Sequence, residues 1–320
     1  MLLARELVLA DETGIGRVEA LDRARATLQV VYDGAPAYAA HRRALDTIEG
    51  YVPRAGSGYV VDAFWSAWDA FASASSYRET IERAVRTGHD TDTTAAIAGG
   101  LAGSWFGLDG IPPDWLGGMR GQPIVAPLLD RLLEQAGWRT SSGPPLRVDW
   151  VDRDAVPAAA GWRGRLGMTF LPGKRCPGSS GDHWRDPEVD AARLRTLGVE
   201  VLVLLVEDRE LREARVPDLV AVSIAQGLAV LRHPVPDGEM PADPAAYRVT
   251  LEEIERRLRD GRAVAVACRG GLGRTGAAVA CLLVDAGLRP EAAIALTRRT
   301  RRGTIETAAQ AAFVHAWPSP

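Results

Sequence analysis

Residues 268–275, "CRGGLGRT", combine a cysteine, an arginine and several glycines at a spacing that can do chemistry on a phosphate group. Five residues separate Cys268 from Arg274, the pattern C-x5-R. A loop of this kind can curl its backbone amides around three phosphate oxygens, because glycine allows the unusual dihedral angles that the curl needs. The amides that would do so belong to Arg269, Gly270, Gly271, Leu272, Gly273 and Arg274. We therefore expect a phosphate-binding loop with Cys268 as its nucleophile and the planar fork of Arg274 on two phosphate oxygens.

The same stretch also fits a second pattern, since Gly271, Gly273 and Gly276 spell the dinucleotide-binding fingerprint G-x-G-x-x-G. That fingerprint requires an acidic residue at the end of a second strand about 20 residues further on. Glu291 lies at such a distance but opens a predicted helix, "PEAAIALTRRTR". The dinucleotide interpretation therefore fails at its second element. A structural turn with a buried cysteine remains the alternative to a catalytic loop.

Phosphoryl transfer to sulfur needs further groups, and the sequence offers candidates for each. The loop feeds a predicted helix whose positive N-terminus favours both a bound phosphate and a thiolate. The Thr275 hydroxyl can donate to the Cys268 sulfur when the thiolate leaves the covalent intermediate. Asp237, in the turn "HPVPDGEMP", can act as general acid and later as base, and Gln310 can position the attacking water. This chemistry needs no cofactor.

The elements that must position these residues alternate between strands and helices. "RLGMTFL", "VEVLVLLVE", "GLAVLRHPV" and "AVAVAC" are predicted strands. Asp186 with Pro187 predicts the start of a helix between the first two strands, and Thr250 with Glu253 predicts the start of another. The alternation predicts an α/β domain with a mostly parallel sheet covered by helices.

The first part of the chain has a different pattern of apolar residues, typical of helices. Val61, Phe64, Ala67, Trp68 and Phe71 follow helical spacing, and Ser76 with Glu79 forms a capping box. We expect residues 1–139 to be an all-α region, 140–146, "TSSGPPL", to be a linker, and 147–320 to be the α/β domain.

A second constellation lies in the helical region. Asp90, Asp92 and Thr93 place three oxygen donors within one turn, and magnesium and manganese prefer such donors. On spacing alone, the same residues are typical of a helix N-cap.

Composition limits the classes of partner. The 320 residues carry a net charge of −3 with pI near 6.0, and the arginines are scattered, so no nucleic-acid partner is expected. No apolar run approaches membrane-spanning length, and we expect a cytoplasmic protein that does not bind a membrane. Three cysteines are too few for a disulfide framework; Cys281 is expected in the core, and Cys176 has no evident partner.

From about residue 165 onwards the chain resembles the dual-specificity phosphatases of the kinase-associated type, also called cyclin-dependent kinase inhibitor 3. The motifs are "GMTFLPGKR", "WRDPEVDAARLRTLGVEVLVLLVEDRELREARVPDL", "HPVPDGEMP", "CRGGLGRTG" and "RGTIETAAQAAFVHAW". The resemblance implies that Cys268 is the nucleophile, Arg274 the phosphate binder, Asp237 the acid and Gln310 a water-positioning residue. The family usually has a histidine before the cysteine, and Ala267 replaces it here.

From about residue 50 to residue 115 the chain is similar to the ADP-ribosylglycohydrolases, through D-T-D-T at 90–93 and a later "IPPDW". The resemblance implies that Asp90, Asp92 and Thr93 bind Mg²⁺. The acidic residues that this family contributes from its N-terminal part are absent from the sequence, so we expect no hydrolase activity from this chain alone. The region is then either a remnant or a half completed by a partner chain.

Together these patterns predict hydrolysis of phosphate monoesters through a phosphocysteine. The expected substrate is a protein phosphorylated on tyrosine, serine or threonine, or a small phosphoester. Two alternatives remain: a magnesium-dependent ADP-ribosyl hydrolase acting with a missing half, and a catalytically silent binding module.

Overall fold

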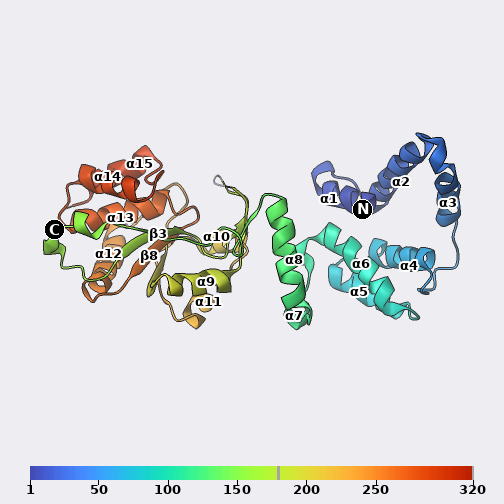
Figure 1. Ribbon diagram of the computed structural model, residues 1–320, viewed down its shortest axis with the longest axis horizontal. Helices are drawn as coiled ribbons and strands as arrows, with labels where there is room; N and C mark the ends of the chain where they lie inside the picture. The colour runs from blue at the N-terminus through green and yellow to red at the C-terminus, as the bar shows by residue number, and fades with distance from the viewer. Residues whose placement is uncertain (179–180, 319–320) are drawn as a thin grey trace. The chain divides into compact units, whose positions relative to one another are not determined.

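The computed structural model describes residues 1–178 and 181–318, and the chain divides into two compact units, Met1–Gly121 and Gln122–Pro320. Unit 1 consists of helices, as predicted (Figure 1). They are α1 (Leu2–Thr13), α2 (Arg17–Asp33), the 3-10 helix η1 (Pro36–Tyr38), α3 (Ala39–Glu49), α4 (Val60–Ala72), α5 (Tyr77–Arg86), α6 (Thr91–Phe106), the 3-10 helix η2 (Leu108–Gly110) and α7 (Pro113–Gly118).

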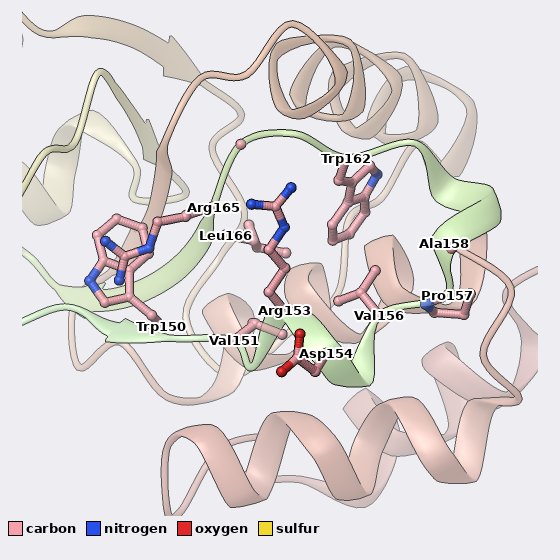
Figure 2. Close-up of a pocket in the computed structure, with 11 residues that line it drawn as sticks. Trp150, Val151, Arg153, Asp154, Val156, Pro157, Ala158, Trp162, Arg165 and Leu166 are labelled. Carbon is pink, nitrogen blue, oxygen red and sulfur yellow. The ribbon is translucent and has the colours of Figure 1, made fainter.

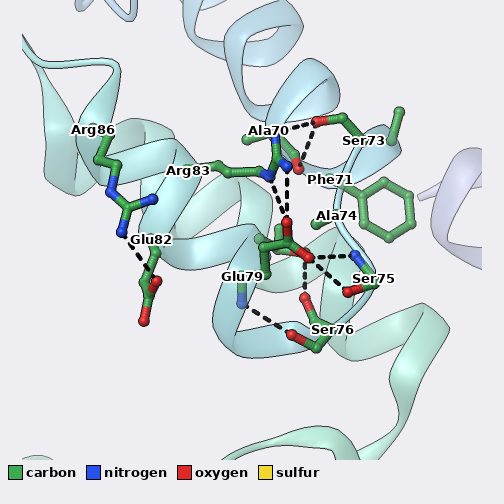
Figure 3. A network of polar contacts seen from close by, with 12 residues as sticks. Ala70, Phe71, Ser73, Ala74, Ser75, Ser76, Glu79, Glu82, Arg83 and Arg86 are labelled. Atoms are coloured by element: carbon green, nitrogen blue, oxygen red, sulfur yellow. Dashed lines mark hydrogen bonds and ion pairs between the residues drawn. The ribbon is translucent and has the colours of Figure 1, made fainter.

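The core of unit 1 is aromatic. Trp65, Trp68 and Phe71 on α4 pack with Leu101 on α6. Ser76 caps α5 by accepting from the Glu79 amide at 3.1 Å, which confirms the predicted cap (Figure 3). The Glu79 carboxylate, however, accepts from the amide and hydroxyl of Ser75 and from Arg83, so the reciprocal half of the capping box is shifted by one residue.

Unit 2 is an α/β structure. Its helices are α8 (Gln122–Gln135), η3 (Arg153–Ala155), η4 (Ala158–Ala160), α9 (Pro187–Thr196), α10 (Asp208–Glu213), α11 (Leu219–Ala225), α12 (Pro244–Arg259), α13 (Gly273–Asp285), α14 (Pro290–Thr300) and α15 (Ala308–Ala316). Its strands are β1 (Arg139–Thr140), β2 (Asp149–Trp150), β3 (Leu166–Phe170), β4 (Arg175–Cys176), β5 (His183–Trp184), β6 (Val201–Leu204), β7 (Ala229–Arg232) and β8 (Val264–Cys268).

The main sheet of unit 2 has the order β2-β3-β8-β6-β7. Strands β3, β8, β6 and β7 are parallel, and only the edge strand β2 is antiparallel, which confirms the predicted mostly parallel sheet. A small sheet, β1-β5-β4, was not predicted. Every residue of β6 and β8 is buried, and each buried valine or leucine contributes about 1.5–3 kcal/mol to stability. Helices α12 to α15 gather beside β3 and β8 (Figure 1).

Parallel pairing brings the strand ends together at one edge of the sheet. Phe170, at the end of β3, pairs with Cys268, at the end of β8, and Leu204 on β6 pairs with Ala267. Residues that follow these strands therefore meet at the carboxyl edge, where ligands bind in open α/β sheets.

One expectation about the elements needs correction. The helix predicted to open at Thr250 begins at Pro244, with Asp243 as its N-cap. The Thr250 hydroxyl lies inside that helix, where it contacts His233 Nδ1 at 2.8 Å. The compact units divide between Gly121 and Gln122, so α8, β1 and the segment 140–146 belong to unit 2, while the domain bounds 1–139, 140–146 and 147–320 stay a prediction. No helix in the part of the chain that the structure describes combines the length and apolarity needed to cross a membrane.

Candidate active site

The predicted phosphate loop forms the connection between β8 and α13. Cys268 is the last residue of β8 and is 3% exposed. Gly271 has φ +69°, and a Cβ there would collide with the Thr169 carbonyl, so both the backbone angle and the space require glycine. At Gly273 a Cβ would lie 2.6 Å from Gln310 Nε2. Gly271 and Gly273 are therefore needed for close packing of this loop, whereas a Cβ at Gly270 would meet no atom within 4 Å.

Arg274 lies in the first turn of α13 and is 2% exposed. Its guanidinium is surrounded by hydrogen-bond acceptors. Its two terminal nitrogens bind the two carboxylate oxygens of Glu210 at 2.7 Å each. It also donates to the Val235 carbonyl at 2.7 Å and to Asp237 Oδ1 at 2.8 Å. The fork of Arg274 is thus held in one orientation by groups that follow β6 and β7.

One donor of Arg274 is left over. Its Nε–H is buried and has no hydrogen-bond partner among the described residues. Leaving a buried charged donor unpaired is costly, and an oxyanion is the acceptor that would satisfy it. If a phosphate replaced Asp237 on the neighbouring terminal nitrogen, Arg274 would grip it with two donors.

Arg274 and Glu210 each shift the pKa of the other. Burial alone would lower the pKa of Arg274, but the hydrogen-bonded Glu210 and the nearby Cys268 and Asp237 outweigh burial and raise the pKa. Burial alone would raise the pKa of Glu210, but Arg274 and the Glu207 amide outweigh it and lower the pKa. Both groups are therefore charged at neutral pH.

The structure brings Asp237 to the loop, as the sequence predicted. The side chain is 64% exposed, in a turn where Gly238 has φ +78°. Among the residues that the structure describes, its side-chain partner is Arg274 alone, and the turn follows β7. An exposed carboxylate on a turn beside the phosphate binder can reach a leaving group that is bound at the loop.

Gln310 and Thr275 are also near the loop. Gln310 is 1% exposed, and its Oε1 accepts from the Glu306 amide at 2.8 Å, so its amide nitrogen faces Gly273. The Glu306 carboxylate lies against Gly273 as well, which the sequence analysis missed. Thr275 is fully buried, and its hydroxyl has no partner among the described residues, so the expected hydrogen bond to the Cys268 sulfur is not formed in this structure.

Lys174 is a second group that the sequence analysis missed. It is the only lysine of the chain and is 4% exposed. Its Nζ donates to the Arg269 carbonyl at 3.3 Å, directly after the nucleophile. Burial lowers the pKa of Lys174 to about 8, although the nearby Cys176 and Cys268 counteract part of that shift. A cation is therefore present beside the loop at neutral pH, in a chain that has Ala267 before the cysteine.

In unit 1, Asp90, Asp92 and Thr93 lie at the start of α6, as the N-cap interpretation of these residues predicts. Asp90 caps α6 by accepting from the Thr93 amide at 3.4 Å. No three His, Cys, Asp or Glu side chains in the described part of the chain are grouped so that they could hold a metal ion. Two carboxylates at the positive end of a helix do not supply the six oxygen ligands that magnesium prefers. The residues present therefore do not fit the metal that the glycohydrolase resemblance implies.

The other two cysteines are buried and free, like Cys268. Cys281 is fully buried in the core, and burial raises its pKa well above the ordinary value, as expected for a structural cysteine. Cys176 lies in β4 and is 6% exposed.

A parallel sheet that presents a cysteine, an arginine and an aspartate at its carboxyl edge defines unit 2 as a cysteine-phosphatase-like α/β domain. Residues 141–294 match the family model of cyclin-dependent kinase inhibitor 3. The cyclin-dependent kinase inhibitor 3 of Sus scrofa is 30% identical over 174 residues, which cover 53% of this chain and 78% of that protein. Through unit 2, the chain belongs to the cyclin-dependent kinase inhibitor 3 family. A solved structure of kinase associated phosphatase with its catalytic cysteine substituted by serine is 29% identical, with a TM-score of 0.47, covering 53% of this chain and 93% of that one.

Residues 2–141 match the ADP-ribosylglycohydrolase family model. The ADP-ribosyl-[dinitrogen reductase] glycohydrolase of Rhodospirillum rubrum is 34% identical over 83 residues, which cover 25% of this chain and 28% of that protein. The chain thus spans little more than a quarter of that relative. The two family models meet at Ser141, within the segment 140–146.

Proposed function

We propose that unit 2 hydrolyses phosphate monoesters through a phosphocysteine intermediate. The observation that carries the proposal is the buried guanidinium of Arg274, which Glu210 fixes and which contacts Asp237, while its Nε–H has no partner in residues 1–178 and 181–318. A rigid, charged donor pair beside a cysteine is suited to stabilise the charge that develops on a transferring phosphoryl group. Membership of a phosphatase family supports the same chemistry.

In the first step the Cys268 sulfur attacks phosphorus, an S–P bond forms and the ester P–O bond breaks. Asp237, in its protonated form, gives its proton to the leaving oxygen. The phosphate takes the place of Asp237 on Arg274, and this frees the carboxyl group for the leaving oxygen. The loop amides and the helix N-terminus stabilise the phosphoryl oxygens.

In the second step a water attacks the phosphocysteine. The Asp237 carboxylate takes a proton from this water, the S–P bond breaks, and inorganic phosphate and the Cys268 thiolate result. Gln310 and Glu306 lie against Gly273, where they can hold the water. None of these steps uses a metal ion.

The substrate class that we propose is a phosphorylated protein, since relatives of this family are named for a protein kinase. Small phosphoesters are the alternative. A cytoplasmic location fits a reactive free thiol, because reducing compartments keep such thiols available.

The test is turnover of p-nitrophenyl phosphate by the full chain, with and without EDTA. We expect turnover that EDTA leaves unchanged and that Cys268→Ser abolishes, whereas Cys281→Ser, a substitution of a core cysteine, retains it in every molecule that folds. Turnover that requires Mg²⁺, or that survives in Cys268→Ser, would contradict the proposal.

For unit 1 we propose no hydrolytic step by this chain alone, since the residues at 90–93 cap a helix. A partner chain that supplies the rest of a glycohydrolase domain is the remaining possibility for activity. Light scattering of the purified chain, alone and mixed with a candidate partner, measures whether such a complex forms.

A further inference from the structure

A cavity of about 690 Å³ lies in unit 2, away from the predicted phosphate loop. It is formed by the segment that leaves β2 at Trp150, passes through η3 and η4, and enters β3 at Leu166. Leu166 pairs with the first residue of β8, and Phe170 pairs with the last, Cys268. Four residues of strand separate the two edges, which is about 13 Å at ~3.3 Å per residue. The cavity therefore lies at the opposite edge of the sheet from Cys268.

Two indoles and two guanidiniums line this cavity. Figure 2 shows Trp150 and Trp162 on opposite sides, with the Arg153 side chain rising between them. The Arg165 guanidinium stacks on the Trp150 ring at 4.0 Å, so it is held flat beside the opening. Val151 and Val156 add apolar surface.

The charges of the cavity are not neutralised by the residues that the structure describes. In the described part of the chain, neither the Arg153 nor the Arg165 guanidinium has an ion pair or a hydrogen bond to a carboxylate. Arg259 of the same unit, by contrast, binds Glu255 at 2.8 Å. Asp154 contributes one carboxylate to the cavity and forms no side-chain ion pair with any residue that the structure describes. The lining therefore carries a net charge of about +1 and offers ten N–H donors of two arginines.

We propose that this cavity is a binding site for a mononucleotide, a ligand that combines a planar aromatic base, a hydroxyl-rich sugar and a phosphate. The base stacks on the exposed face of Trp162, because indole faces bind every base with little sequence preference. The phosphate binds the two unpaired guanidiniums, whose planar forks match its oxygens. The Asp154 carboxylate accepts from sugar hydroxyls, as carboxylates do in other nucleotide sites.

The size and composition of the cavity agree with this assignment. Small-molecule sites have volumes of about 300–1,000 Å³, with apolar walls and a few convergent polar groups. The buried Nε1–H of Trp162 has no partner among the described residues, but it is not accessible from the cavity and takes no part in the binding that we propose. The site is independent of the proposed phosphatase chemistry, since none of its residues belongs to the phosphate loop.

The experiment is calorimetric titration of AMP into the full chain carrying Cys268→Ser, which prevents hydrolysis of the ligand. We expect one AMP per chain and weaker binding of adenosine and of ribose 5-phosphate, because each lacks one half of the recognised chemistry. Arg153→Ala should weaken AMP binding at least tenfold, since it removes charge-assisted hydrogen bonds to the phosphate. Trp162→Leu should weaken AMP by a similar factor and leave ribose 5-phosphate within twofold.

Arg163→Ala is the matched control. Arg163 lies on the same segment, is exposed and donates to the Arg259 carbonyl at 2.8 Å, but does not line the cavity. It should leave AMP affinity within twofold. Absence of binding by AMP, ADP and GMP at about 1 mM overturns the proposal. Binding that Arg153→Ala leaves unchanged also overturns it, because the AMP then occupies the phosphate loop or another site.

Discussion

Replacing Glu210 by glutamine tests how the phosphate-binding arginine is held. Glu210 and Arg274 are 1% and 2% exposed, and two hydrogen bonds of 2.7 Å join them. Glutamine keeps the shape of the side chain but removes its charge, so the buried guanidinium loses its main counter-ion. Breaking a buried pair from one side costs about 3–5 kcal/mol of the free energy of unfolding.

For a domain of the size of unit 2, each kcal/mol shifts Tm by about 2–4 °C, so Glu210→Gln should lower Tm by about 6–20 °C. Scanning calorimetry of the full chain measures this shift. The kcat/KM for p-nitrophenyl phosphate, measured below the onset of unfolding, should fall about 100-fold, because small misplacements of a positioning group have effects of that size.

Glu213→Gln is the control, since Glu213 lies on the same helix and pairs with Arg269 at the surface at 3.1 Å. Exposed pairs contribute about 0–1 kcal/mol, so this variant should resemble the wild type. The pKa of Glu210 is lowered in the folded state, so its contribution is present above the unfolded pKa of about 4.3 and is lost as pH falls through the lower folded value. The difference in stability between the wild type and Glu210→Gln should therefore shrink below about pH 4. Equal Tm and kcat/KM in the two variants would refute the reasoning.

Three further predictions concern other parts of the chain. Burial lowers the pKa of Lys174 to about 8, so the unfolded chain binds more protons than the folded chain between that pH and about 10.4. The free energy of unfolding should therefore rise by about 3 kcal/mol across this range. Denaturant unfolding at several pH values should show the rise in the wild type but not in Lys174→Met. Asp237→Asn should lower kcat by about 100-fold or more while leaving Tm nearly unchanged, because its side chain is 64% exposed; a kcat like that of the wild type would exclude it as the acid. Asp90→Ala should destabilise α6 by about 1 kcal/mol through loss of the cap, to the same extent with and without Mg²⁺ in thermal melts, whereas a metal ligand would give a loss seen only with Mg²⁺.

Much of the candidate site was predictable because its main motif is continuous in the sequence. Cys268, the loop amides and Arg274 follow one another along the chain, so their geometry is decided by local backbone angles. The place of Asp237 was predictable for another reason: its turn follows a strand that the sequence predicts to be parallel, so the turn lies at the same edge of the sheet as the loop. Which residue anchors Arg274 was not predictable, because Glu210 is 64 residues away and meets it only through the pairing of β6 with β8.

Other misses also have physical reasons. Lys174 lies between β3 and β4, and the burial of its side chain depends on how the small sheet packs. No pattern of neighbouring residues in the sequence predicts that burial. The start of α12 was misplaced because Asp243 and Pro244 form an equally good cap about two helical turns before Thr250. In unit 1 a single pattern at 90–93 was compatible with a metal site and with a cap, and only the three-dimensional surroundings distinguish them.

The most direct test of the central claim is a search for phosphate on Cys268. The full chain is mixed with p-nitrophenyl phosphate, quenched rapidly in acid and digested, and the peptide containing residue 268 is examined by mass spectrometry. The account predicts a phosphorylated Cys268 that forms during the first turnover and is absent from Cys268→Ser. Turnover of the substrate with phosphate on another residue, or with no phosphorylated peptide in the quenched sample, would contradict it.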